Sequence, residues 1–157
     1  MAITKLITDS LGAGVGGKVL QVVSAVFGSQ TSTTSTSDSD TGLNANITPS
    51  STSSKILVQV THNGVLKYTG ATGLGVKIKL FRNTTELDVL SSEAGWNNTS
   101  QYSDVGAVSN DYLDSPNTTS QINYKTTLAC GNVSGTSAVI GSAGSNATIV
   151  LMEIAGW

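Results

Sequence analysis

The sequence has few charged residues. Lys and Arg number 8 and Asp and Glu number 10 in 157 residues, so charged side chains make up 11% and the net charge is −2. A typical soluble domain carries about 25%. A basic nucleic-acid-binding protein needs clustered Lys and Arg and a high pI, whereas this pI is 5.1. The composition therefore excludes nucleic acid as a partner.

Cysteine, histidine and long apolar runs are also scarce. Cys130 is the single cysteine and His62 the single histidine, which excludes a disulfide within the chain and a closed zinc site. No stretch approaches the roughly 20 consecutive apolar residues of a membrane span. The start shows no basic region followed by an apolar core and a cleavage site. We therefore expect no secretory signal and synthesis in a reducing cytoplasm.

Hydroxyl side chains take the place of charge. The chain has 22 Ser and 21 Thr, while hydrophobic residues make up 38%. That apolar share is too high for a disordered chain, and the length suits one ordinary domain with a real core. The composition predicts a folded head with an uncharged, hydrated surface.

Residues 1–17 form a separate unit. Ile3, Leu6, Ile7 and Leu11 recur at helical spacing, and a glycine-rich joint follows at 12–17. A helix of about eleven residues is marginal by itself in water. We expect an attachment segment that orders only against a partner or a neighbouring copy, followed by a head domain at residues 18–157.

The first segment of the head, residues 18–29, reads KVLQVVSAVFGS and is apolar at both odd and even positions. A strand that is apolar on both sides is typical of one buried on both sides. In a small β-domain the second covering layer can come from another subunit. This segment is the main internal indication of oligomerisation.

The rest of the head alternates apolar and polar residues with a period of two. This alternation predicts strands that bury Ile56, Val58 and Val60, then Val76, Ile78 and Leu80. Further strands are expected at 43–47, 86–90 (with Leu87 and Val89 on one face), 102–112, 121–130 and 147–155, and residues 30–40 read as an exposed Ser/Thr loop. Eight or nine short strands with turn clusters between them predict an all-β antiparallel sandwich or jelly roll. Asn63-Gly64 indicates a hairpin turn or a bulge.

Motifs for catalysis or cofactors lack their context. Gly12, Gly14 and Gly17 match a dinucleotide-binding pattern, but the expected order of strand and helix is reversed. Parity places His62 on the inward side of its strand, and Cys130 shares a face with apolar residues, so we interpret both as core residues. The acidic residues are interpreted as solvated, with Asp114 as a turn residue. We predict no catalytic, cofactor or metal-binding residues and no enzymatic activity.

Aromatic and amide side chains gather in the least regular stretch, at Trp96, Asn98, Tyr102 and Tyr112. Aromatic rings stack on the apolar faces of sugars, and amides hydrogen-bond sugar hydroxyls. The stretch is therefore a candidate carbohydrate-binding site. The alternative is that these aromatics fix loops onto the sandwich.

Four phrases of the sequence resemble one family: MAITKLITDSLGAGVGGKVLQVV, ITPSSTSSKILVQVTHNG, YLDSP with TTSQINYKTTL, and TIVLMEIAGW. They are similar to small virion structural proteins of tailed bacteriophages, marine and cyanobacterial ones especially, described as tail-fibre-like or appendage proteins. The similarity in order and spacing covers nearly the whole chain.

The resemblance implies a non-enzymatic virion protein that forms a homotrimer through a β-sandwich or jelly-roll head. Residues 1–17 would attach to other virion proteins, and the head would face outward to adhere to the host surface. The alternative function is a carbohydrate-binding, receptor-recognition module, and a weaker one is a fragment of a polysaccharide depolymerase.

Overall fold

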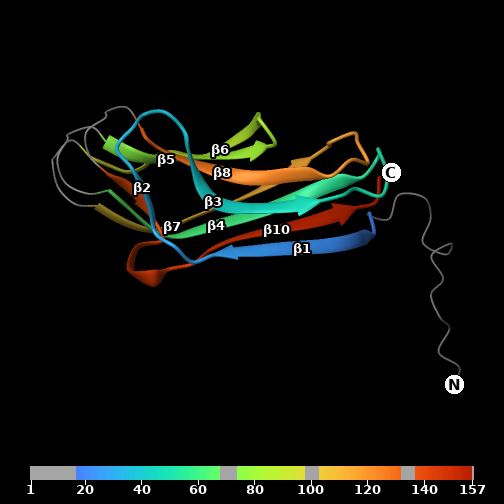
Figure 1. The fold of residues 1–157 in the computed structure, drawn as a ribbon, viewed down its shortest axis with the longest axis horizontal. Helices are drawn as coiled ribbons and strands as arrows, with labels where there is room; N and C mark the ends of the chain where they lie inside the picture. The colour runs from blue at the N-terminus through green and yellow to red at the C-terminus, as the bar shows by residue number, and fades with distance from the viewer. Residues whose placement is uncertain (1–16, 68–73, 98–102, 132–136, 157) are drawn as a thin grey trace, which may run out of the picture.

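The computed structural model describes residues 17–67, 74–97, 103–131 and 137–156. Their strands pair antiparallel in two sheets that pack face to face as a sandwich (Figure 1). The strands are β1 (Val19–Phe27), β2 (Thr31–Thr33), β3 (Ser39–Ile47), β4 (Lys55–Lys67), β5 (Leu74–Arg82), β6 (Thr85–Asn97), β7 (Ser103–Asp114), β8 (Ile122–Cys130), β9 (Ala138–Ile140) and β10 (Ala147–Ile154). One 3-10 turn, η2 (Ser142–Gly144), precedes β10.

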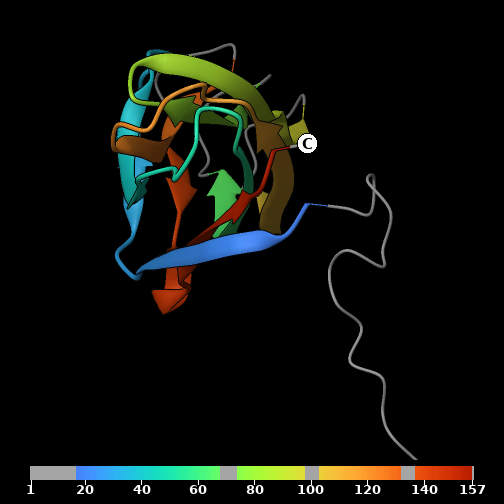
Figure 2. The same ribbon diagram turned by 90° about the vertical axis from the view of Figure 1, so that its right-hand side faces the viewer.

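The strand order is that of a jelly roll. In the larger sheet β1, β10 and β4 are neighbours, β7 pairs the other side of β4, and short β9 and β2 continue the sheet beside the far end of β4. The smaller sheet has the order β3-β8-β5-β6. Numbered among the eight long strands, the two sheets read first-eighth-third-sixth and second-seventh-fourth-fifth. This order confirms the predicted jelly roll, and the view in Figure 2 shows the two sheets wrapped around one interior.

The alternating pattern fills that interior as predicted. Ile56, Val58 and Val60 are all buried, and between them Leu57 and Gln59 are only partly covered. Such alternation in an antiparallel strand puts one face into the core and leaves the other at the surface. At Asn63 the register with β7 shifts, so Asn63-Gly64 is a bulge within β4.

Two apolar clusters share the core. The larger one contains Leu43, Ala45, Ile47, Ile56, Val58, Val60, Leu80, Ile122, Tyr124, Ala147, Ile149 and Leu151. The smaller contains Val65, Val76, Ile78, Leu128, Cys130, Ala138 and Ile140. A buried polar chain also crosses the interior, in which the hydroxyl of Thr126 is 3.0 Å from Nε2 of His62 and 2.6 Å from the hydroxyl of Thr41. These residues are buried, and their mutual hydrogen bonds offset the loss of water.

Two sequence-based expectations about the strands were wrong. Residues 30–40 are not a simple exposed loop, because Thr31–Thr33 pair with β9 and the Ser35 carbonyl accepts the Cys130 N–H. Leu87 and Val89 do not share a face, since Leu87 packs against the core and Val89 is 41% exposed. Register shifts between β5 and β6 break the period of two there.

The proposed N-terminal helix lies outside the described residues. Among the residues that are described, no helix is long and apolar enough to cross a membrane.

Candidate interaction surfaces

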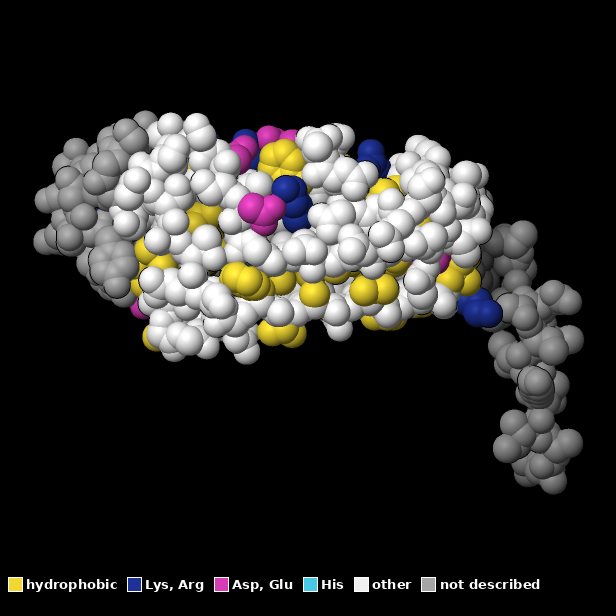
Figure 3. Space-filling model, in the orientation of Figure 1, with side chains coloured by type: hydrophobic (Ala, Val, Ile, Leu, Met, Phe, Trp, Pro, Cys, Tyr) yellow, Lys and Arg dark blue, Asp and Glu magenta, His cyan; other side chains and the backbone are white. Residues whose placement is uncertain are grey.

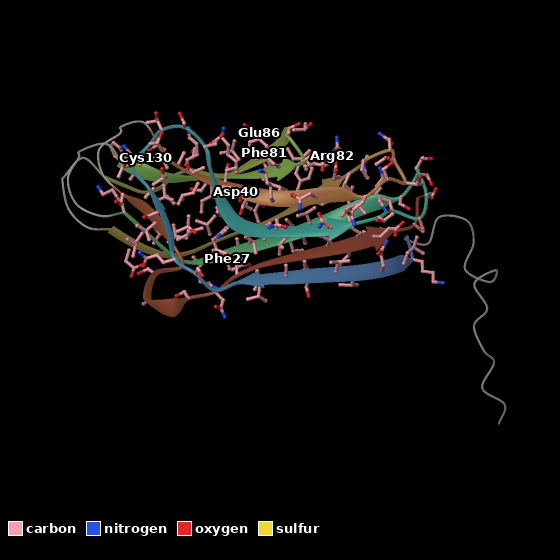
Figure 4. All side chains as sticks on the ribbon, in the orientation of Figure 1. Phe27, Asp40, Phe81, Arg82, Glu86 and Cys130 are labelled. Atoms are coloured by element: carbon pink, nitrogen blue, oxygen red, sulfur yellow. The ribbon has the colours of Figure 1, made fainter. Side chains whose placement is uncertain are left out.

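The two outer faces of the sandwich differ in chemistry. On the smaller sheet, Lys79 forms ion pairs with Asp38 at 3.0 Å and with Glu86 at 2.9 Å, and Lys125 pairs with Asp40 at 2.8 Å. Figure 3 shows charged side chains gathered over this upper part of the molecule, and Figure 4 places Asp40 and Glu86 there. The charged side chains of this face are in contact with water, so the face does not require a protein partner.

The outer face of the larger sheet is apolar over β1 and β10. The register places Val22 opposite Met152, Met152 opposite Leu57, and Leu57 opposite Leu113, so one apolar row crosses four strands. Val22 is 58% exposed and Leu113 is 48% exposed. We call the exposed and half-exposed apolar residues of this face the apolar strip: Leu20, Val22, Val26, Leu57, Leu113, Val150, Met152 and Ile154.

The apolar strip follows the edge of the sandwich. β1 is the terminal strand of the larger sheet, and yellow side chains run along it in the lower part of Figure 3. From Leu20 to Val26 the strip extends about 20 Å, at roughly 3.3 Å per residue. An exposed, uncharged apolar edge strand invites association with another chain.

The inner face of β1 is covered by its own chain. Val23, Ala25 and Phe27 pack against the larger core cluster, and Figure 4 shows Phe27 at the end of β1. A Cβ at Gly42 of β3 would lie 2.6 Å from the Phe27 ring, so Gly42 leaves room for that ring. Residues 19–27 are therefore covered on one face by their own chain, and cover of the other face by another subunit stays a prediction.

A buried carboxylate fixes the start of β1 to the sheet. Glu153 of β10 accepts hydrogen bonds from Nε2 of Gln21 at 2.6 Å and from the backbone N–H and hydroxyl of Ser50, both at 2.7 Å. Burial by itself would raise the pKa of Glu153, but the hydrogen bonds to its carboxylate lower it from 4.5 to about 2. The carboxylate is therefore ionised and structural.

A second buried carboxylate joins the two sheets. Nη1 of Arg82 on β5 lies 2.9 and 2.8 Å from the two oxygens of Asp114 on β7, and the Tyr124 hydroxyl donates to the same carboxylate at 2.6 Å. Burial and the Asp114 charge raise the pKa of the Tyr124 hydroxyl well above its ordinary value. The prediction that Asp114 is a solvated turn residue was wrong.

His62 and Cys130 are core residues, as predicted. Both are fully buried, and burial lowers the pKa of His62 from 6.5 to about 4 and raises the pKa of the Cys130 thiol. Nδ1 of His62 has no hydrogen-bond partner among the described residues. A neutral buried imidazole and a protonated thiol are suited to packing. Within the described ranges, no group of three or more His, Cys, Asp and Glu is placed to hold a metal ion.

The structure describes two of the candidate sugar-binding residues, Trp96 and Tyr112, and does not bring them together. Trp96, near the end of β6, is 53% exposed. Tyr112 packs inward against the larger core cluster. It lies nine residues after Ser103, the first residue of β7, which corresponds to about 30 Å along an extended strand. The structure does not place Tyr112 beside Trp96. Asn98 and Tyr102 lie outside the described residues.

A polar depression lies on the larger sheet at the end away from the start of β1. It has a volume of about 480 Å³ and is lined by Asn63, Gly64, Leu66, Asp104, Gly106, Ser142, Ala143, Ser145 and Asn146. Backbone positions with positive φ shape it: Gly64 (61°) in the β4 bulge, Gly106 (81°) in β7, and Ala143 (56°) and Gly144 (75°) in η2. Sequence reasoning missed this site because its residues come from three separate segments. Asn63-Gly64 was recognised only as a turn or bulge.

A scan against models of protein families and a search of curated proteins gave no match. Solved structures of infectious bursal disease virus are similar to the chain. The VP2 subviral particle has 14% identity and a TM-score of 0.47, with 87% of this chain and 38% of that chain covered. The Gx strain of the virus has 13% identity and a TM-score of 0.44, with 86% and 37% covered. The present chain thus spans about two fifths of the length of those chains.

Proposed function

We propose that this protein is a non-enzymatic structural protein of a virion and that it assembles as a homotrimer through the apolar strip. The observation that carries the proposal is the exposure of apolar side chains along β1, with Val22 at 58% and Val26 at 65%. Covering these side chains removes apolar surface from water at about 25 cal/mol per Å². Identical copies present the same strip and can shelter it for one another.

The contrast between the two outer faces also supports assembly through the apolar strip. The smaller sheet carries ion-paired, solvated side chains on its outer face. On the described part of β4 and β7, the apolar strip is bordered by two charged side chains, Lys55 and Asp111. Depletion of charge is typical of the buried centre of a protein interface. The apolar strip would thus face the neighbouring copies and the smaller sheet the solvent. The number of three copies comes from the resemblance to phage appendage proteins.

The buried ionisable groups have structural uses that suit a non-enzymatic role. His62 hydrogen-bonds Thr126, Asp114 binds Arg82 and Tyr124, and Glu153 holds β1. A surface of uncharged hydroxyls stays hydrated in salt, where attraction between exposed charges is screened. Many copies on one particle allow weak individual contacts with a host surface to act together.

Light scattering after size exclusion tests the assembly. The full chain is expected to elute with about three times its 16.0 kDa mass. A strict monomer at micromolar concentration would contradict the proposal.

Residues 1–17 are proposed to attach the head to other virion proteins. A chain lacking them should keep the circular dichroism of the head but be absent from purified particles. A full-length chain carried through the same purification is the control. Incorporation of the truncated chain into particles would show that attachment lies elsewhere.

A second candidate function is recognition of a host glycan near Trp96, with Asn98 and Tyr102 as neighbouring donors. The exposed indole of Trp96 favours it, because an aromatic face left in water is available for stacking. A Trp96→Ala chain should lose binding on a glycan array that the native chain binds. Unchanged binding would remove Trp96 from the site.

A further inference from the structure

We propose that the polar depression at the far end of the larger sheet is a saccharide-binding site. The inference is independent of the assembly role, because it rests on a different group of residues. Its volume, about 480 Å³, lies within the range of small-ligand sites, roughly 300–1,000 Å³. It is large enough for one or two sugar rings.

The depression is lined by hydrogen-bonding side chains, several atoms of which have no partner in the described part of the chain. Asp104 uses Oδ1 to accept the Gly106 N–H at 2.9 Å, and Asn63 uses Nδ2 to donate to the Asn146 carbonyl at 2.8 Å. Within the described part of the chain, no hydrogen-bond partner is found for Oδ2 of Asp104 or Oδ1 of Asn63. The same holds for the Asn146 carboxamide and for the hydroxyls of Ser142 and Ser145. Two side chains are thus held in place by one atom while another atom remains available.

The chemistry of this lining selects an uncharged polyhydroxyl ligand. A sugar hydroxyl both donates and accepts, and here carboxylate and amide oxygens accept while amide N–H groups and serine hydroxyls can donate. Asp104 is the single charged side chain of the lining, so an anion would be repelled. A single carboxylate also offers little negative charge to hold a hard cation, so neutral hydroxyl ligands suit the lining better.

Two glycines, Gly64 and Gly106, shape the walls of the depression. A Cβ at Gly64 would lie 2.5 Å from the backbone nitrogen of Ser142, so glycine there lets the η2 turn close against the β4 bulge. At Gly106, by contrast, an added Cβ would meet no atom within 4 Å. A larger side chain at Gly106 would therefore project into free space at the rim. Bulges commonly redirect side chains beside functional sites.

A glycan array read with four full-length chains tests the inference. The native chain should bind a subset of neutral glycans, and Asp104→Asn should reduce that binding at least five-fold, because a hydrogen bond to a charged group is replaced. Gly106→Asn should also reduce it, since asparagine tolerates a positive φ and fills the rim. The matched control is Asp111→Asn, which removes the same charge from the same strand outside the depression and should bind like the native chain.

A titration followed by NMR locates the site. With glucose, galactose, mannose and N-acetylglucosamine, each to about 50 mM, amide signals of Gly64, Gly106 and Ser142–Asn146 should shift for the sugars that the array identifies. A blank array, equal binding by Asp104→Asn, or shifts that avoid these residues and disappear only in Trp96→Ala would overturn the inference. A monomeric chain that still binds through Asp104 would contradict the assembly proposal and leave this one standing.

Discussion

Gln21 donates a hydrogen bond from Nε2 to the Glu153 carboxylate at 2.6 Å, across the boundary between the edge strand β1 and β10. The same carboxylate accepts two hydrogen bonds from Ser50. One buried charge therefore fixes both the strand that carries the exposed valines and the turn that precedes β4. Assembly through β1 depends on a strand held in this way, because an edge strand that frays offers no defined surface.

Glu153→Gln should destabilise the head at neutral pH, since an amide nitrogen replaces an oxygen that accepts from N–H groups. The pKa of Glu153 is about 2 in the folded chain against 4.5 as its ordinary value. The carboxylate's stabilisation is therefore complete above pH 4.5 and is lost as the pH falls towards 2, by about 3 kcal/mol in all. Urea midpoints measured across this range should fall steeply for the native chain. If the urea midpoint of Glu153→Gln falls equally steeply with pH, the pH dependence comes from other groups.

His62 should make stability depend on pH in a higher window. Burial depresses its pKa to about 4, so the unfolded chain takes up a proton first as the pH falls below 6.5. Stability is complete above pH 6.5 and declines as the pH falls to 4, by about 3 kcal/mol. His62→Gln, which can keep a hydrogen bond to Thr126, should flatten the profile between pH 6.5 and 4. A native profile already flat there would mean that the imidazole is not buried in its neutral form.

Asp114→Asn should be destabilising, by about 2–3 kcal/mol, because a neutral amide replaces the ionised partner of the Arg82 guanidinium. Tyr124→Phe removes one hydrogen bond to the same carboxylate and should have a smaller effect, about 1 kcal/mol. Asp111→Asn on the same strand is the exposed control, expected within about 0.5 kcal/mol of the native chain. Thermal unfolding ranks the three variants, and a small effect of Asp114→Asn would show that the network adds little.

Gly64→Ala and Gly106→Ala separate backbone strain from crowding. Both glycines have positive φ, 61° and 81°, but a Cβ meets the Ser142 backbone only at Gly64. Gly106→Ala should lower the free energy of unfolding by about 1 kcal/mol from strain, and Gly64→Ala by about 3 kcal/mol or more. Equal losses in chemical denaturation would mean that the η2 turn moves away without cost.

The sequence predicted the strands with a strict period of two, because burial on one face determines that pattern. Ile56, Val58 and Val60 illustrate it, and the same parity correctly placed His62 inside. The pattern failed where bulges change the parity, as at Leu87 and Val89, and where a polar strand pairs by backbone alone, as at Thr31–Thr33. The sequence also placed Asp114 in a solvated turn. Its partner Arg82 is distant in the sequence, so no local pattern indicates the ion pair.

The interaction surfaces were predicted less well than the fold. The apolar character of both faces of residues 19–27 was visible in the sequence, but its continuation through Met152, Leu57 and Leu113 depends on strand register. The polar depression is built from three segments that meet only in the folded chain. Neither feature has a spacing that a single sequence reveals.

The most direct test of the account is sedimentation equilibrium of two matched variants, Val22→Asp in the apolar strip and Val89→Asp on β6. Both valines are exposed, 58% and 41%, so both variants should fold, which circular dichroism checks. The native chain and Val89→Asp should sediment at about three times 16.0 kDa, and Val22→Asp should fall to the mass of a single chain. A native monomer, or a Val22→Asp chain that keeps the native mass, would contradict assembly through the apolar strip.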